Sequence, residues 1–240
     1  MEGETIALNT NQLSRRLERV AYYAEGYQSL ADIGSDHAYL PCYLCLRDAG
    51  LHAIAGEINE GPYQSARKQV ELSRLENQIE VRKGSGLEVI NDNEQVDVIT
   101  VAGMGGPLIA SILELGLEKL TGSQRLVLQP NVASQAVREW LMSHQFNIVA
   151  EEIIEEDDKI YEIVVAEKSD SLVTYTEVEL MMGPLLIQNQ TKVFKKKWIQ
   201  EKNSWERVLK QLKQGTETIE LSNKKEALKR KIDMVEEVFV

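Results

Sequence analysis

The residues best suited to chemistry lie between Leu30 and Pro41, where an apolar stretch runs into a glycine flanked by two carboxylates. A short strand, a tight turn at Gly34 and the start of a helix are typical of a nucleotide-binding βα turn. Gly34 permits this turn and the close approach of a ligand. Asp32 and Asp36, however, place negative charge where a pyrophosphate would require backbone N–H groups, and the spacing does not match G-x-G-x-x-G. The pattern favours a positively charged nucleoside as ligand; an ordinary acidic βα loop is the alternative.

S-adenosylmethionine, which carries sulfonium and ammonium groups, is the leading candidate for such a ligand, and a second residue supports it. Glu57 stands at the carboxyl end of an apolar segment, 23 residues after Gly34. In doubly wound folds an acidic residue at about this distance hydrogen-bonds a ribose diol. We therefore expect Glu57 and the adjoining Ile58 to bind the cofactor. A strand-end glutamate that faces solvent is the alternative.

Two glycine-rich turns follow later strands. The first is expected to bring backbone close to a flat ligand such as adenine, and the second to keep side chains out of a reaction cleft and form its floor. The first turn consists of Gly84, Ser85, Gly86 and Leu87. The second turn consists of Ala102, Gly103, Met104, Gly105 and Gly106. A plain glycine turn is the alternative for the second, although three glycines in four positions exceed what a turn needs.

Three polar residues are candidates for substrate contacts. Arg16 lies on a predicted amphipathic helix just before the turn at Gly34, where it has room to contact a substrate phosphate. A solvated helix face is the alternative. Gln129 and Asn131 follow a predicted strand. Their amides could hydrogen-bond a base edge, but Asn and the intervening Pro130 are also common in turns.

Hydrophobic periodicity across residues 1–168 predicts the elements that bring these residues together. Short apolar segments alternate with amphipathic ones, which indicates parallel strands joined by helices. The carboxyl ends of parallel strands meet at one edge of a sheet, so the turns would face one cleft. A final antiparallel hairpin completes a seven-stranded, Rossmann-like α/β domain. The predicted strands are residues 29–33, 52–58, 79–82, 96–101, 125–128, 148–156 and 160–167. The predicted helices are residues 11–25, 39–49, 61–75, 108–120 and 133–145.

Residues 169–240 have a different pattern, which predicts a helical second domain. Apolar residues recur every seven positions at Leu221, Leu228 and Val235. Two long amphipathic helices around Gly215 are therefore expected to form an antiparallel coiled-coil hairpin. The apolar stripe of the first of these helices consists of Ile199, Trp205, Val208, Leu209 and Leu212.

The net charge of −11 at pH 7 conceals a basic tail. Residues 1–170 contain 14 Lys and Arg against 28 Asp and Glu, whereas residues 189–231 contain 13 basic and five acidic residues. A basic helical face with an aromatic residue fits phosphate binding, and hence RNA; a solvated coiled-coil surface is the alternative. The densest basic patch consists of Lys195, Lys196 and Lys197, followed by Trp198.

Length and composition narrow the class of protein further. A chain of 240 residues can hold one α/β domain and a small appendage. It has no apolar run long enough to span a bilayer, and its polar N-terminal segment lacks a signal-peptide core, so we expect a cytoplasmic protein. Cys42 and Cys45 have C-x-x-C spacing, but no second Cys or His pair is placed to complete a zinc site. We expect buried helical thiols and no metal.

Together these motifs resemble those of the bacterial class I, S-adenosylmethionine-dependent tRNA methyltransferases that act on N1 of adenine 22. The strings S-D-H-A-Y-L-P and G-M-G-G are specific, whereas the single glycine turns are not. The matching segments are residues 14–17, 31–41, 55–57, 103–109 and 160–165. One residue departs from the family pattern, because Ser85 stands where the family typically has an aspartate that is expected to hydrogen-bond the adenine amino group. Ser85 could do so only through its hydroxyl oxygen, which would weaken cofactor binding.

The resemblance implies a methyltransferase domain at residues 1–168 and a tRNA-binding coiled-coil domain at residues 169–240, with tRNA as the partner. It also implies transfer of a methyl group from S-adenosylmethionine to adenine N1. The acidic turn at Gly34, after the first predicted strand, would hold the cofactor together with Glu57. The residues of this turn are Asp32, Gly34, Ser35, Asp36 and His37.

Two of these residues are expected to have catalytic roles. Adenine N1 has a free lone pair, so no general base is needed before transfer. Asp36 would favour the positive charge that moves onto the adenine, and His37 is the only plausible base. Tyr161, in the last matching segment, is a further RNA-binding candidate.

Two alternatives stay open at this point. A methyltransferase that acts on another RNA or on a small molecule would share the cleft, although a small-molecule enzyme has little use for a basic hairpin. A non-catalytic RNA-binding protein could keep the fold without the activity. The sequence predicts no particular oligomeric state.

Overall fold

The computed structural model describes residues 12–120, 122, 124–212 and 218–239. The chain divides into two compact units, Met1–Thr174 and Tyr175–Val240. This division falls slightly after the expected boundary at residue 168, because two hydrogen bonds tie the intervening segment to the first unit. Ser169 N donates to the backbone carbonyl of Gln145 at 2.9 Å, and Val173 N donates to the side-chain oxygen of Gln145 at 3.0 Å.

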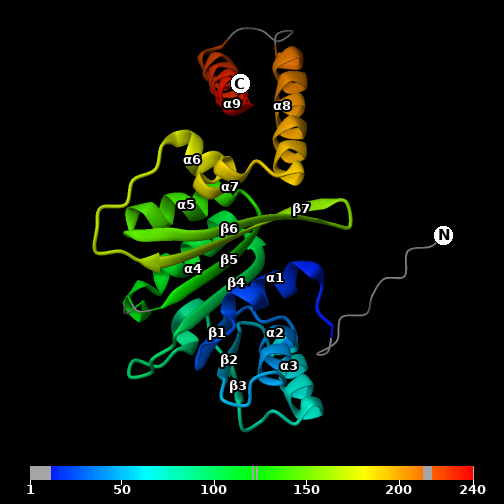
Figure 1. The fold of residues 1–240 in the computed structure, drawn as a ribbon, viewed down its shortest axis with the longest axis vertical. Helices are drawn as coiled ribbons and strands as arrows, with labels where there is room; N and C mark the ends of the chain where they lie inside the picture. The colour runs from blue at the N-terminus through cyan, green and yellow to red at the C-terminus, as the bar shows by residue number, and fades with distance from the viewer. Residues whose placement is uncertain (1–11, 121, 123, 213–217, 240) are drawn as a thin grey trace, which may run out of the picture. The chain divides into compact units, whose positions relative to one another are not determined.

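The first unit contains a seven-stranded sheet with the strand order β3-β2-β1-β4-β5-β7-β6 (Figure 1). The strands are β1 (Ser29–Ile33), β2 (His52–Glu57), β3 (Ile79–Lys83), β4 (Val98–Gly105), β5 (Arg125–Val132), β6 (Phe146–Glu156) and β7 (Lys159–Lys168). β7 pairs antiparallel with β5 and β6, and the other pairs are parallel. The predicted Rossmann-like α/β sheet with its closing hairpin is confirmed. β1 and β4 are apolar in sequence because both faces of these central strands are covered.

Helices cover the two faces of this sheet (Figure 1). The helices on one face are α1 (Arg15–Ala24), α2 (Tyr39–Cys45) and α3 (Glu60–Ser73), and those on the other are α4 (Gly106–Leu115) and α5 (Ser134–Ser143). Two short 3₁₀ helices, η1 (Gly86–Val89) and η2 (Leu117–Lys119), follow β3 and α4. α1 begins after Ser14, whose Oγ accepts a hydrogen bond from Leu17 N at 3.3 Å. This N-cap sets the position of the next residues, including Arg16.

β4 differs from its prediction, because the strand extends through Gly105 where a free glycine turn was expected after residue 101. Its pairing with β5 shifts register between Ala102 and Met104, where Gly103 adopts a φ of +79°. The glycine stretch is therefore a bulged strand end, which bends the backbone next to the sheet edge. Gly106 has a packing role instead of the expected place on a cleft floor, since a Cβ there would overlap the backbone of Ala133.

A buried ion cluster fastens the closing hairpin to α5. Arg138 is fully buried, and its Nε donates to Glu151 of β6 at 2.7 Å while Nη2 donates to Glu162 of β7 at 2.8 Å. Removing one partner of such a cluster would leave an uncompensated buried charge. The cluster thus links three elements on the face opposite to α1.

The expectation of buried helical thiols is confirmed. Cys42 and Cys45 are free and buried on α2. Burial raises the pKa of the Cys42 thiol to about 11, so it is a protonated and unreactive group at neutral pH. In the described part of the chain, no helix combines the length and the hydropathy needed to cross a membrane.

The second unit is helical, as predicted. Its helices are α6 (Glu177–Met182), α7 (Pro184–Asn189), α8 (Lys192–Leu212) and α9 (Ile219–Phe239). α8 and α9 run antiparallel, because Phe194 near the start of α8 meets Phe239 at the end of α9, with ring centroids 5.9 Å apart. Gly215, the expected turn residue, lies outside the described residues.

The interior of the second unit differs in part from the predicted stripe. Ile199 is 50% exposed, whereas Phe194 and Trp198 are the buried residues of α8. α9 buries Ile232 and Val235. The predicted stripe omitted Phe194 and Trp198 near the start of α8, because an aromatic pair within a lysine run resembles a surface segment by composition alone.

Candidate active site

The turn after β1 has an unusual backbone. Asp36, His37 and Ala38 are three consecutive non-glycine residues with φ values of 43°, 69° and 55°. Each such conformation is sterically costly and persists only where the surroundings hold it, which is common at functional sites. Gly34, with a φ of 69°, adopts the same region without that cost.

Hydrogen bonds to β2 hold this strained turn. Gly34 N and Ser35 N both donate to the carbonyl of Gly56, at 2.9 and 3.2 Å, and Asp36 N donates to Glu57 Oε1 at 2.6 Å. Glu57 is buried, and burial together with the nearby Asp32 and Asp36 carboxylates raises its pKa. Glu57 thus supports the turn as well as standing at the place predicted for a ribose contact.

Asp32 lies beneath the turn. It is buried, and its two carboxylate oxygens accept hydrogen bonds from Ser35 Oγ at 2.5 Å and from Thr100 Oγ1 at 2.6 Å. Burial raises the pKa of Asp32 to about 6, and the two hydrogen bonds oppose this shift. The predicted cofactor ligand therefore also ties the turn after β1 to β4.

Asp36 and His37, the predicted catalytic pair, lie at the surface. The Asp36 side chain is 86% exposed, and His37 Nε2 is 3.6 Å from Asp36 Oδ1. The His37 ring stacks on Tyr39 with a centroid distance of 5.4 Å and an interplanar angle of 26°. Of this pair, Asp36 lines the cleft described next, whereas His37 stands beside it.

A cavity of about 340 Å³ opens at the carboxyl ends of β1, β4 and β5, next to α1. Ten of the predicted site residues meet there. Its lining consists of Arg16, Leu17, Asp32, Gly34, Ser35, Asp36, Tyr39, Leu40, Ala102, Gly103, Met104, Asn131 and Tyr161. Three lining residues, Leu17, Tyr39 and Leu40, were not among the predicted site residues. Tyr39 and Leu40 could have been found, because they lie in the same S-D-H-A-Y-L-P string as the predicted ligands.

The residues predicted to surround the nucleoside lie at or just after the ends of β2 and β3, outside this lining. Gly84 N donates to the carbonyl of Glu57 at 3.0 Å, which ties the loop after β3 to the end of β2. Ile58 and Ser85 are exposed at this position. The Leu87 side chain, in contrast, is buried under the loop against Gly116. Leu87 thus supports the loop through its buried side chain.

The polar candidates for substrate contacts form one network. The fully buried Gln129 uses its Oε1 to accept hydrogen bonds from Arg16 Nη1 and, at 3.0 Å, from Gly103 N. Its Nε2 donates to Asn131 Oδ1 at 3.2 Å, and Asn131 Nδ2 donates to the carbonyl of Gly103 at 2.7 Å. The Gln129 amide is committed within the chain, so it supports the cleft wall and does not face a base as expected.

Arg16 is held from two sides in the cleft. Besides its contact with Gln129, its Cζ lies 5.4 Å from the centroid of the Tyr161 ring, within the range of a cation–π contact. Burial lowers the pKa of Arg16, whereas electrostatic interactions with Tyr161, Glu156 and Asp36 act to raise it.

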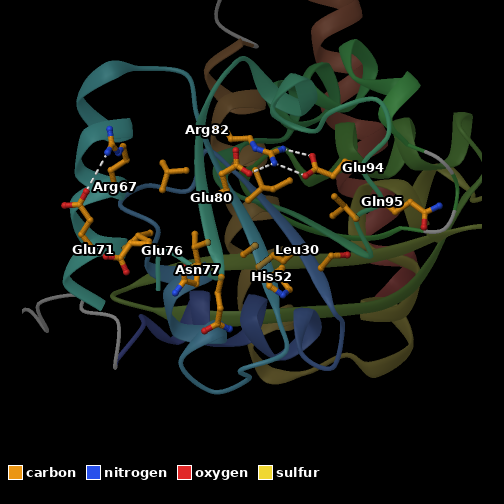
Figure 2. A pocket seen from close by; sticks show the side chains of 18 residues that line it. Leu30, His52, Arg67, Glu71, Glu76, Asn77, Glu80, Arg82, Glu94 and Gln95 are labelled. Carbon is orange, nitrogen blue, oxygen red and sulfur yellow. Dashed lines mark hydrogen bonds and ion pairs between the residues drawn. The ribbon is translucent and has the colours of Figure 1, made fainter. Parts of the chain in front are cut away.

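A larger cavity, of about 580 Å³, lies elsewhere on the first unit (Figure 2). It is reached at the amino ends of β1, β2 and β3, where Ser29, His52 and Ile79 begin these strands. Figure 2 shows Arg82 directed at Glu80 and Glu94, so its charge is neutralised within the chain. Ligands of open α/β sheets bind at the carboxyl ends of the strands, which favours the smaller cleft as the functional site.

Fold and site define a class of protein. A seven-stranded sheet whose last strand is inserted antiparallel, with an acidic glycine turn after β1, is the fold of class I methyltransferases. A family model described as tRNA (adenine(22)-N(1))-methyltransferase matches residues 30–237. The chain belongs to this family.

Known relatives cover almost the whole chain. A tRNA (adenine(22)-N(1))-methyltransferase of Bacillus subtilis is 46% identical over 236 residues, which are 97% of this chain and 99% of the relative. A crystal structure of the B. subtilis adenine-22 tRNA methyltransferase has 44% identity and a TM-score of 0.90, covering 96% of this chain and 100% of that one. A putative enzyme of the same type from Streptococcus pneumoniae, in complex with S-adenosyl-L-methionine, has 43% identity, a TM-score of 0.84 and coverages of 95% and 100%.

Proposed function

We propose that this chain transfers a methyl group from S-adenosylmethionine to N1 of adenine 22 in tRNA. Family membership supports the reaction. The observation that carries the proposal for this chain's own residues is the strained turn at Asp36–Ala38, which Glu57 holds over a cleft at the carboxyl ends of the strands. Residues in such costly conformations cluster at ligand-binding and catalytic sites.

The residues present fit the cofactor. Gly34 and Met104 form a cradle in the cleft lining, where Gly34 leaves room for the flexible end of the Met104 side chain. Carboxylates of Asp32, Asp36 and Glu57 surround this cradle and suit a ligand with two positive charges. When bound, S-adenosylmethionine supplies an activated methyl group.

The chain's own contribution to transfer is positioning and electrostatics. The target adenine must leave its stack to enter the cleft. Its N1 needs no general base, so alignment within the cleft accounts for much of the acceleration. The exposed Asp36 carboxylate at the mouth favours the positive charge of the product. His37, stacked on Tyr39 beside the cleft, stabilises the turn and is not required as a base.

The second unit supports tRNA as the substrate. Lys195 and Lys196 are exposed on α8, where they can contact phosphates. Lys197 is half-buried, with its Nζ 4.9 Å from the centroid of the Trp198 ring, so it contributes more to packing. A tRNA substrate supports the expected cytoplasmic location.

The proposal is tested by nucleoside mass spectrometry of unmodified tRNA transcripts incubated with the full chain and the cofactor. N1-methyladenosine should form in a transcript with adenosine at position 22 and not in a matched transcript with guanosine there. Methylation of both transcripts, or methylation of a small molecule alone, would show another substrate. Failure to bind the cofactor in calorimetry would show a non-catalytic protein.

A further inference from the structure

We propose that an exposed apolar lip beside the cleft packs against the tRNA bases next to adenine 22 and holds that adenine out of its stack. The lip consists of Pro107, Leu108 and Val132. This inference rests on the proposed function, and it assigns the RNA-facing side of the cleft to the ends of β4 and β5. The partner is a stacked RNA segment, and the lip contacts the faces of its bases.

The first argument is that apolar side chains gather at this point in exposed positions. Val132 is 66% exposed and Leu108 is 54% exposed, and Pro107 is exposed as well. A Cβ on Gly105 would lie 3.9 Å from Val132 Cγ2 and 4.0 Å from Pro107 Cδ, so these two side chains flank the same point. Exposed apolar residues scattered singly need no explanation, whereas a group drawn from two separate segments indicates an interaction site.

The second argument is the position of the lip at the mouth of the cleft. Met104 and Asn131 line the cleft, and the chain runs from each of them into the lip. Gly105 of β4 pairs with Val132 of β5 at this point. Glu57, the predicted ribose contact, ends β2 on the far side of β1. A cofactor that extends from β2 toward β4 therefore leaves the side formed by β4 and β5 for the incoming base.

The third argument is charge. Residues 1–170, which make up most of the first unit, contain 28 Asp and Glu against 14 Lys and Arg. Residues 102–113 and 130–137, which form this side of the mouth, contain none of these four residue types. α4 and α5 begin here, and neither has an acidic residue in its first turn. The exposed Asp36 lies on the turn after β1. RNA can therefore approach over the lip with less repulsion than over that turn.

The fourth argument is what the reaction requires of such a surface. An adenine that enters the cleft loses its stacking contacts and leaves a gap between its neighbours. Apolar side chains that wedge between bases offset this loss in proteins that distort nucleic acids. The amides of Gln129 and Asn131 are engaged in hydrogen bonds with Gly103, so they do not take this role. The lip has apolar surface of the kind that packs on base faces.

The test measures extrusion of the base separately from binding. The probe is a tRNA transcript with 2-aminopurine at position 22, whose fluorescence rises when the base leaves its stack. The double variant Leu108→Ser and Val132→Ser is compared with the unaltered chain in the presence of S-adenosylhomocysteine. Single-turnover methylation is measured on the transcript with adenosine at position 22. Leu115→Ser, which changes a side chain 81% exposed at the other end of α4, is the matched control.

We expect the double variant to slow single-turnover methylation by about tenfold or more, because it loses two apolar contacts that form only when the base is extruded. The fluorescence rise should shrink in parallel. Affinity for S-adenosylhomocysteine should stay the same, because the lip lies outside the cleft lining. Leu115→Ser should match the unaltered chain.

An unchanged rate with a full fluorescence rise in the double variant would overturn the inference. Equal losses in Leu115→Ser would also overturn it, and so would a loss of S-adenosylhomocysteine affinity large enough to explain the slower rate. An unaltered chain that forms no N1-methyladenosine would overturn the proposed function itself, and the inference with it.

Discussion

Asp32 shows how one residue can serve both the fold and the cleft. Its carboxylate accepts hydrogen bonds from Ser35 and Thr100, and so joins the turn after β1 to β4. The same burial raises its pKa from 3.8 to about 6. The charged form is therefore less favourable in the folded chain than in the unfolded chain, and ionisation of Asp32 costs stability at neutral pH.

This cost predicts a specific pH dependence. Because the folded pKa is above the unfolded one, the folded chain binds more protons between about pH 4 and pH 6. Asp32 therefore contributes most to stability below pH 4, and that contribution falls as pH rises to 6 by up to about 3 kcal/mol. The check is urea unfolding of the unaltered chain and Asp32→Asn at several pH values. The difference between their unfolding free energies should shift in favour of Asp32→Asn as pH rises from 4 to 6, and stay level from 6 to 8. A constant difference would contradict the raised pKa.

At the scale of elements, the ends of β4 and β5 form a close-packed corner beside the cleft. Asn131 and Gln129 of β5 hydrogen-bond the backbone of Gly103 in β4. Gly106, the first residue of α4, lies against the backbone of Ala133. The corner requires glycine at that point, because a backbone neighbour cannot move aside as a flexible side chain can.

We predict that Gly106→Ala lowers the free energy of unfolding by about 1–3 kcal/mol, the usual cost of overpacking a well-packed site. Gly105→Ala is the matched control, because the nearest atom to a Cβ there, Val132 Cγ2, is 3.9 Å away. The control should lose less than about 1 kcal/mol in the same denaturant titration. Equal losses at the two positions would show that the corner can relax.

At the scale of the whole molecule, charge is divided between the two units. The net charge of −11 combines a strongly acidic first unit with a basic stretch in the second. A negative first unit would repel RNA at long range, so we expect affinity for tRNA to depend on local contacts from the basic helices. Such contacts release counterions and make binding depend on salt.

We predict that the double change Lys195→Gln and Lys196→Gln weakens tRNA binding and makes the log–log salt slope less steep by about one to two. Affinity for S-adenosylhomocysteine should stay the same. Lys68→Gln, an exposed lysine on α3, is the control and should leave the slope unchanged. The measurement is tRNA affinity across a salt series. An unaltered slope in the double variant would mean that these lysines face solvent and do not contact RNA phosphates.

The local parts of the site could be predicted from the sequence because they are encoded within short segments. Gly34, Asp36 and Glu57 lie within about 25 residues, and the βα pattern alone places them at neighbouring strand ends. The alternation of strands and helices and the closing hairpin likewise followed from periodicity, whereas the strand order came only from the structure. The coiled-coil stripe was less well predicted, since Ile199 is exposed and Trp198 is buried.

Tertiary structure alone decided which side chains are free to meet a ligand. Gln129 and Arg16 are 113 residues apart in the chain and are joined by a hydrogen bond. This bond makes Gln129 a buried support and holds Arg16 over Gly103. Arg138 gave no signal in the sequence, although it joins α5 to both strands of the hairpin. Periodicity reports which face of an element is buried, but hydrogen-bond partners depend on contacts between segments distant in the chain, and those exist only once the sheet has formed.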